Sequence, residues 1–137
     1  MRLVLDTNVF IAAFVARGVC HDLLEHCERS HHVVGSEFIL GELESKLLQK
    51  FKVPPEKAAA AVALVRSHME LVQPAALDGP VCRDPDDDWV LATALAGGCE
   101  CIITGDKDLL ALGTFAGIRI LPPGSFWTYE SARRGLT

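Results

Sequence analysis

RLVLDTNVFIAAFVA, residues 2–16, places a short apolar run, three polar residues and a second apolar run in direct succession. Residues 2–6 are rich in β-formers and show no alternation of apolar and polar side chains, which is typical of a strand buried on both faces. Residues 8–16 are apolar on all sides and predict a buried helix. A buried strand joined directly to a buried helix indicates an α/β fold. The polar residues at the junction need a separate explanation.

The rest of the chain alternates short apolar strands with helices. Further strands are predicted at 31–36, 71–74, 101–106 and 118–121, and helices at 21–29, 36–51, 56–70, 86–98, 107–112 and, after a turn, within 122–134. This alternation predicts a three-layer α/β/α domain with a mainly parallel sheet of four or five strands. No repeat or linker interrupts the pattern, so we expect residues 1–137 to form a single domain.

Composition narrows the class of protein. The chain has 137 residues, half of them apolar, which suits one domain with a sizeable core. No apolar stretch is long enough for a transmembrane helix, and the first residues lack the regions of a signal peptide. We therefore expect a cytoplasmic protein without a membrane partner. The five cysteines show no CxxC spacing and are expected to be thiols, and the five histidines fit no ligand pattern.

The net charge of −5 argues against a protein that holds nucleic acid simply by attracting its phosphates. It does not argue against an enzyme that collects metal cations in a carboxylate cluster, because the ions then supply positive charge locally. Any positive rim would come from scattered side chains, namely Lys46, Lys50, Lys52, Arg83 and Lys107.

Four acidic residues are expected to converge at one edge of the sheet. Asp6 and Asp106 follow the first and the fourth predicted strand, and ligands of such sheets bind beyond the carboxyl ends of the strands. Asp87 lies in the first turn of the helix before the fourth strand, and Glu42 lies on the helix after the second. Clustered carboxylates repel one another unless a cation lies between them, and all-oxygen ligands suit Mg²⁺ or Mn²⁺. A metal site that cleaves phosphate esters is the simplest interpretation.

Four segments together resemble the PIN domain family, and within it the bacterial and archaeal proteins described as toxins of toxin–antitoxin pairs. They are LDTNVFIAAF (5–14), SEFILGELESKLL (36–48), RDPDDDWVLATAL (83–95) and IITGDKDLL (102–110), in the order and spacing of that family. The resemblance implies a ribonuclease that depends on Mg²⁺ or Mn²⁺ and leaves 5′-phosphate and 3′-hydroxyl ends. It also implies a cognate antitoxin and a homodimer.

By this resemblance, the acids that bind the metal and act in catalysis are Asp6, Glu42, Asp87 and Asp106. Asp88 competes with Asp87, because it lies only one residue out of register with the pattern of the family.

Five supporting residues are also expected, and Asp88 is one of them. Thr7 and Asn8 would hydrogen-bond neighbouring carboxylates or bound water and so fix their orientation. Thr104 precedes the last acid by two residues, and Asp84 lies where the helix before the fourth strand begins.

Simpler interpretations of the same acids stay open. Asp6 fits an ordinary turn after a strand, and the aspartates at 86–88 also complement a helix dipole. Asp106 fits the N-cap of the helix 107–112, and Asp108 is expected to stabilise the first turn of that helix. The alternative function is a catalytically weak or inactive PIN-like module that binds RNA or an antitoxin. A phosphatase of the haloacid-dehalogenase type is disfavoured, because it needs an aspartate where Asn8 stands.

Overall fold

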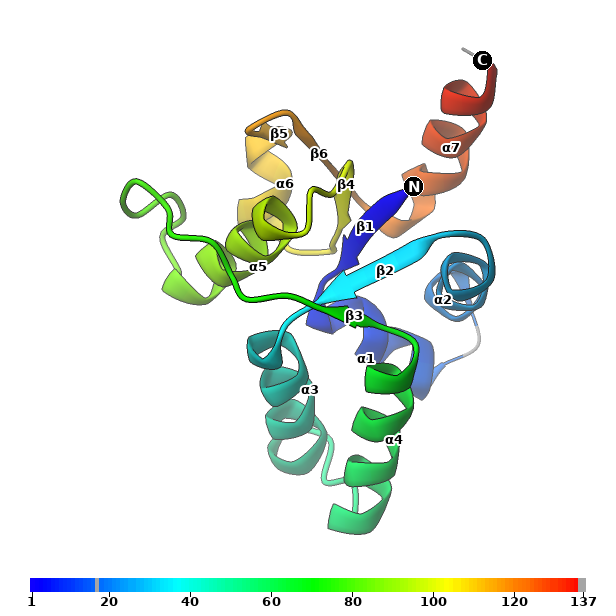
Figure 1. Ribbon diagram of the computed structural model, residues 1–137. Helices are drawn as coiled ribbons and strands as arrows, with labels where there is room; N and C mark the ends of the chain where they lie inside the picture. Colours follow the sequence, from blue (N-terminus) through cyan, green and yellow to red (C-terminus); the bar gives the residue numbers. More distant parts are fainter. Residues whose placement is uncertain (17, 136–137) are drawn as a thin grey trace.

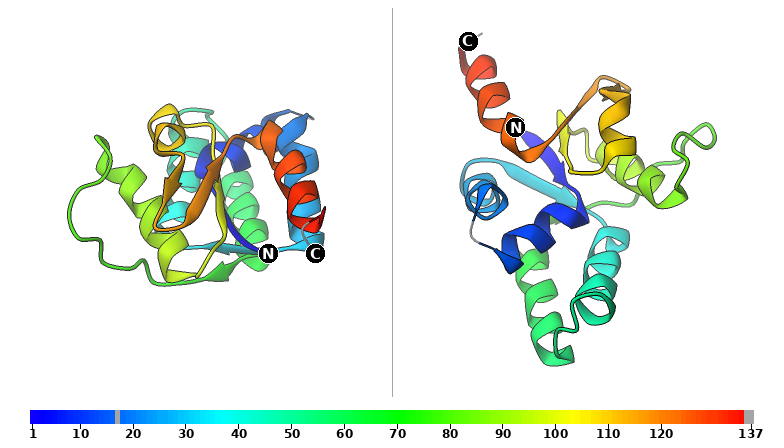
Figure 2. Two further views of the ribbon diagram at one scale, coloured as in Figure 1. Left: turned by 90° about the horizontal axis from the view of Figure 1, so that it is seen from above. Right: turned by 180° about the vertical axis from the view of Figure 1, so that it is seen from behind.

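In the computed structural model, which describes residues 1–16 and 18–135, a twisted sheet lies between two layers of helices (Figure 1). In chain order the elements are β1 (Arg2–Leu5), α1 (Thr7–Val15), α2 (Val19–Ser30), β2 (His32–Gly35), α3 (Glu37–Gln49), α4 (Pro55–Ser67), β3 (Glu70–Leu71), α5 (Pro85–Ala96), β4 (Cys101–Ile103), α6 (Lys107–Leu112), β5 (Thr114–Phe115), β6 (Ile118–Leu121), the short 3₁₀ helix η1 (Pro123–Ser125) and α7 (Phe126–Gly135). Helices α1 to α4 lie on one side of the sheet and α5 lies on the other (Figures 1 and 2). The three-layer α/β prediction is confirmed.

The sheet has the strand order β3-β2-β1-β4-β6-β5, and all neighbours are parallel except β5 and β6. The described residues thus form six strands, and the prediction of four or five is wrong. The strand that was missed, β5, has only two residues, too few to show any periodicity. It pairs antiparallel with β6 across a turn in which Ala116 and Gly117 have positive φ values of 50° and 80°.

The central strands position the residues that follow them. Leu5 of β1 pairs in register with Ile103 of β4, and the Asp6 nitrogen donates to the Ile103 carbonyl at 3.0 Å. Both strands are buried on both faces, as their unbroken apolar sequences predicted. Because the strands are parallel and in register, the chain after Leu5 and the chain after Ile103 emerge side by side.

Tertiary contacts shift one predicted boundary and change the role of one residue at the start of a helix. Helix α4 ends at Ser67, and Glu70 belongs to β3, where Arg2 holds its carboxylate with an Nη2 to Oε2 distance of 2.6 Å. Ser36 occupies the N-cap position of α3, but its side chain makes no capping hydrogen bond. Its hydroxyl lies instead 2.9 Å from the hydroxyl of Thr93 on α5, so it joins two helices.

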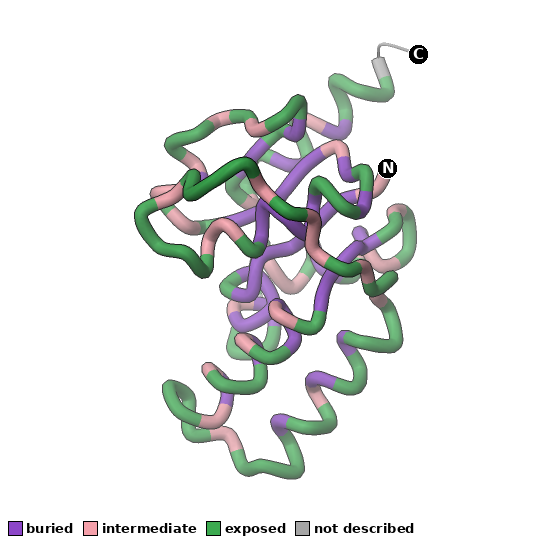
Figure 3. The backbone as a smooth tube through the Cα atoms, turned by 60° about the vertical axis from the view of Figure 1, so that its left-hand side comes forward, coloured by how far each residue is buried: buried purple, intermediate pink, exposed green. Residues whose placement is uncertain are grey.

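The buried residues follow the sheet and the inner sides of the helices, whereas residues 72–84 form a largely exposed loop (Figure 3). All five cysteines are free thiols, as expected. Within residues 1–16 and 18–135, no single helix is long and apolar enough to cross a membrane; only α1 and α2 taken together, with a sharp bend between them, reach that length.

Candidate functional site

Asp6 lies at the carboxyl end of β1 and is only 5 % exposed. Its Oδ1 accepts a hydrogen bond from the Thr7 nitrogen at 2.7 Å, and its Oδ2 accepts one from the Thr104 hydroxyl at 2.7 Å. Burial raises the pKa of Asp6, and the two hydrogen bonds oppose this rise only in part. The charge of Lys46 also lowers this pKa, whereas the charge of Asp106 raises it. The Asp6 carboxylate is therefore held in one orientation and keeps a raised affinity for protons.

Thr104 connects this carboxylate to the next one. Its hydroxyl donates to Asp6 and accepts a hydrogen bond from the Asp106 nitrogen at 3.0 Å. Asp106 caps α6 through its Oδ2, which accepts from the Leu109 nitrogen at 2.9 Å. Asp106 is therefore the N-cap of α6, as expected. The cap uses Oδ2, so Oδ1 is left for other contacts.

Asp87 extends the cluster from the first turn of α5, whose N-cap is Asp84. One carboxylate oxygen from each of Asp87, Asp106 and Asp108 lies within 4.8 Å of the other two. Burial, the largest cause, and the charges of neighbouring carboxylates together raise the pKa of Asp87 to about 7. In decreasing order of effect these neighbours are Asp106, Asp84 and Asp6. We call Asp6, Asp87, Asp106 and Asp108 the acidic cluster.

Asp88 points in a different direction. Its two oxygens accept hydrogen bonds from the backbone nitrogens of Val81 at 3.1 Å and Cys82 at 2.8 Å. Burial would raise the pKa of Asp88, but these hydrogen bonds hold it below its ordinary value. The two consecutive aspartates therefore differ, since Asp87 interacts with the other acids and Asp88 fastens the loop before α5.

A lysine links Glu42 to the segment that contains Asp6. It lies on α3 one turn before Lys46, whose Nζ is 4.0 Å from the Glu42 Oε1. The same Nζ donates to the Asn8 Oδ1 at 3.2 Å, and its charge lowers the pKa of Asp6. Asn8 was expected to bond to a carboxylate or to water, but its side-chain oxygen receives this ammonium group instead. Lys46 thus links Glu42 to the segment that follows β1.

Thr7 contacts Asp6 through its backbone. Its backbone nitrogen, and not its hydroxyl, donates to Asp6. Thr7 is fully buried, and in the described part of the chain its hydroxyl is the one buried side-chain polar atom without a hydrogen-bond partner. A buried hydroxyl that lacks a partner is costly, so this atom has a free donor for a water or a ligand.

The sequence had not placed Asp108 in the cluster. It was expected only to stabilise the first turn of α6, yet its carboxylate lies beside those of Asp87 and Asp106. Its Oδ1 also accepts a hydrogen bond from the Arg83 Nη2 at 2.7 Å. The sequence did contain a signal for this placement. Asp108 lies two residues after Asp106, the acid that follows a strand, and it lies in the first turn of a helix that begins at the same edge of the sheet.

The fold is similar to that of three solved structures. VapBC2 from Rickettsia felis bound to a DNA fragment from its promoter is 15 % identical, with a TM-score of 0.64 over 88 % of this chain and 97 % of that one. VapC20 of Mycobacterium tuberculosis, a sarcin–ricin loop cleaving toxin, is 20 % identical, with a TM-score of 0.59 over 85 % and 98 %. VapBC-1 from nontypeable Haemophilus influenzae is 17 % identical, with a TM-score of 0.64 over 90 % and 99 %.

At these identities the three structures show a similarity of fold and nothing more. No curated protein sequence matches the chain. A family model, that of the PIN domain, matches residues 2–108, which is more than half of the chain and includes every member of the acidic cluster together with Glu42. The chain therefore belongs to the PIN domain family.

Proposed function

We propose that the protein is a ribonuclease that depends on Mg²⁺ or Mn²⁺ and hydrolyses phosphodiester bonds of RNA. In this proposal Asp6, Glu42, Asp87 and Asp106 hold the metal. The observation that carries it is the convergence of acids beyond β1 and β4, where burial and the charges of the other acids together raise the pKa of Asp87 to about 7. Acids gathered in this way repel one another, and a divalent cation relieves this repulsion.

The donor set fits such a cation. All four proposed ligands offer carboxylate oxygens, which suit Mg²⁺ and Mn²⁺ better than softer ions. Each oxygen of Asp6 accepts one described hydrogen bond and so keeps a lone pair for a metal. Asp87 suits the helix position better than Asp88, because both oxygens of Asp88 already accept from backbone nitrogens.

A divalent cation bound here would lower the pKa of a coordinated water and stabilise charge on the phosphoryl oxygens. The chain itself contributes orientation, because the Thr104 hydroxyl fixes Asp6 and also receives the Asp106 nitrogen. Lys46 and Arg83 lie beside the acids and offer positive charge to the phosphates of an approaching RNA strand. The unpartnered Thr7 hydroxyl is suited to hydrogen-bond a water at the site.

We further propose that the protein acts in the cytoplasm, as a single domain over residues 1–137, as the toxin of a toxin–antitoxin pair and as a homodimer. The similarity to VapBC2 and VapBC-1 supports an antitoxin partner, because VapC-like proteins share this fold. The similarity to VapC20, described as a sarcin–ricin loop cleaving toxin, supports RNA as the substrate.

The test is digestion of RNA by the purified protein with Mg²⁺, with Mn²⁺ and with a chelator. We expect cleavage only with metal, products with 5′-phosphate and 3′-hydroxyl ends, and no cleavage by Asp6→Asn. The matched control is Asp22→Asn, which changes an exposed aspartate on α2 and should cleave like the unchanged protein. Undiminished metal-dependent cleavage by Asp6→Asn would refute the site. RNA binding without cleavage would point to the alternative, an inactive binding module.

A further inference from the structure

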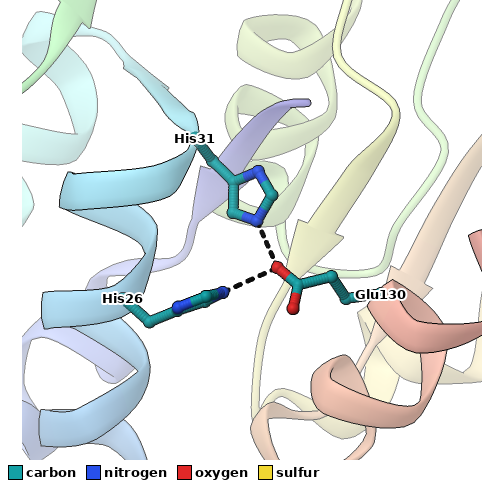
Figure 4. Close-up of side chains that lie close together, drawn as sticks. All are labelled: His26, His31 and Glu130. Atoms are coloured by element: carbon teal, nitrogen blue, oxygen red, sulfur yellow. Dashed lines mark hydrogen bonds and ion pairs between the residues drawn. The ribbon is translucent and has the colours of Figure 1, made fainter. Parts of the chain in front are cut away.

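A second polar cluster joins the two ends of the chain. His26 lies on α2, His31 directly follows that helix, and Glu130 lies on α7, which stands beside α2 (Figures 1 and 2). The His26 Nε2 lies 2.6 Å and the His31 Nε2 lies 2.5 Å from the same Glu130 oxygen, Oε2. Figure 4 shows both rings pointing at this oxygen. We call these three residues the histidine cluster.

Packing restrains the histidine cluster before any ligand arrives. The side chains of His31 and Glu130 are each 7 % exposed, and that of His26 is 23 % exposed. The Phe126 ring packs edge-on against His31, with centroids 5.6 Å apart, and the Trp127 ring lies 4.7 Å from His26. Side chains held by packing lose little conformational entropy when they bind an ion.

The atoms that face away from the centre are held as well. Glu130 Oε1 lies 3.6 Å from the Arg134 Nη2, and His31 Nδ1 lies 3.0 Å from the Met1 nitrogen. The first contact restrains the orientation of the Glu130 carboxylate, and the second restrains the His31 ring.

We propose that His26, His31 and Glu130 form a second metal site of this chain, one that takes a transition-metal ion of the Zn²⁺ class. Two imidazole nitrogens and one carboxylate oxygen are a donor set of Zn²⁺ sites, in contrast to the all-oxygen acidic cluster. The three donor atoms already lie within 4.8 Å of one another. Tetrahedral Zn²⁺ ligands are about 3.3 Å apart, so each ring would withdraw from Glu130 by less than about 1 Å.

His26 is the most exposed of the three proposed ligands. A cavity of about 280 Å³ borders it, with Asp22, Glu25, Arg29 and Ser30 as the other lining residues, so an ion would approach the site past His26. A water arriving the same way would complete four-coordination. The bound ion would join α7 to α2 and so stabilise the folded protein against unfolding.

The first experiment is a Zn²⁺ titration of the full chain carrying Asp6→Asn and Asp87→Asn, so that the acidic cluster does not compete. We expect one Zn²⁺ retained per chain after dialysis and a rise in Tm of several degrees. Co²⁺ in place of Zn²⁺ should give the intense visible absorption of a four-coordinate site. Absence of retained Zn²⁺ and of the Co²⁺ absorption would overturn the proposal and leave the histidine cluster as a set of hydrogen bonds only.

Variants then assign the ligands. His26→Gln keeps a side-chain donor for Glu130 and should lower Zn²⁺ affinity at least about tenfold without changing Tm in chelator by more than a few degrees. The matched control is His21→Gln on the same helix, whose ring lies 3.3 Å from Glu25 and is not part of the cluster. It should bind Zn²⁺ like its parent. Equal Zn²⁺ affinity of the two variants would place the ion elsewhere and overturn the proposal. If His26→Gln fails to fold, Glu130→Gln takes its place.

Discussion

Asp6 and Glu130 are equally buried, each 5 % exposed, yet their pKa values shift in opposite directions. Burial by itself raises the pKa of both. At Asp6 the hydrogen bonds do not overcome burial, and the charge of Asp106 adds to it. At Glu130 the hydrogen bonds from His26 and His31 overcome burial, and the pKa falls below its ordinary value.

The difference shows that the neighbours of a carboxylate, together with its burial, indicate what it can bind. The positive side chains near the acidic cluster do not balance its negative charge. The cluster therefore favours a hard cation, which is held by electrostatic attraction. In the histidine cluster the two rings already donate to the Glu130 carboxylate. An ion must compete with these hydrogen bonds for the nitrogen lone pairs, which favours a metal of the Zn²⁺ class.

The largest effect is expected when Asp87→Asn is compared with Asp88→Asn. Asp87→Asn removes a carboxylate that faces the other acids and should lower RNA cleavage at least about a hundredfold, because a metal ligand is lost. Asp88→Asn should leave cleavage within a few-fold and lower the free energy of unfolding by about 1 kcal/mol, because its carboxylate accepts from two backbone nitrogens. Initial cleavage rates and urea unfolding measure the two quantities. The reverse ranking in cleavage would mean that Asp88 is the ligand.

A smaller effect is expected from Thr104→Val, which keeps the shape of the side chain and removes the hydroxyl between Asp6 and Asp106. Cleavage at saturating Mn²⁺ should fall about 10- to 100-fold, the range for residues that orient metal ligands. Thr93→Val is the matched control, because Thr93 is also a fully buried threonine with a hydrogen-bonded hydroxyl, but its partners are Ser36 and Trp89. It should lose stability and keep cleavage. Equal cleavage by both variants would remove Thr104 from the site.

Sequence pattern could predict the parts of the fold and site that depend on strand ends. Asp6 and Asp106 follow apolar runs, and parallel pairing brings the ends of such runs to one edge. The pattern could not decide between Asp87 and Asp88, because neighbouring helix residues point in directions about 100° apart and the choice depends on which one meets the loop nitrogens. That contact is tertiary and leaves no local signal.

The histidine cluster lay beyond sequence reasoning for a related reason. Glu130 is far from both histidines along the chain, and His26 and His31 do not show the spacing of a known ligand motif. Only the docking of α7 beside α2 brings them together. The two-residue strand β5 was missed likewise, because its pairing with β6 and not its own residues makes it a strand.

The smallest effects concern stability against pH, and the two clusters should respond with opposite signs. The pKa of Asp87 rises from 3.8 to about 7 on folding, so its deprotonation destabilises the folded state. This penalty is absent below the unfolded value, grows between the two values and is complete above about pH 7. In metal-free buffer, Asp87→Asn should therefore raise Tm by several degrees at about pH 8 and leave it nearly unchanged at about pH 4. Mn²⁺ added to the unchanged protein should likewise raise Tm more at the higher pH.

His31 should act in the other direction, because burial lowers its pKa from the ordinary 6.5 on folding. The unfolded chain then binds the proton more tightly, so stability is complete above about pH 6.5 and is lost as the pH falls below that value. His31→Gln keeps a donor for Glu130 without a group that titrates there, and should reduce the loss of Tm between about pH 7 and pH 5 by a few degrees. The exposed neighbour His32 gives the control, since His32→Gln should follow the unchanged protein. If the two profiles coincide, folding does not lower the pKa of His31, and its protonation does not destabilise the fold.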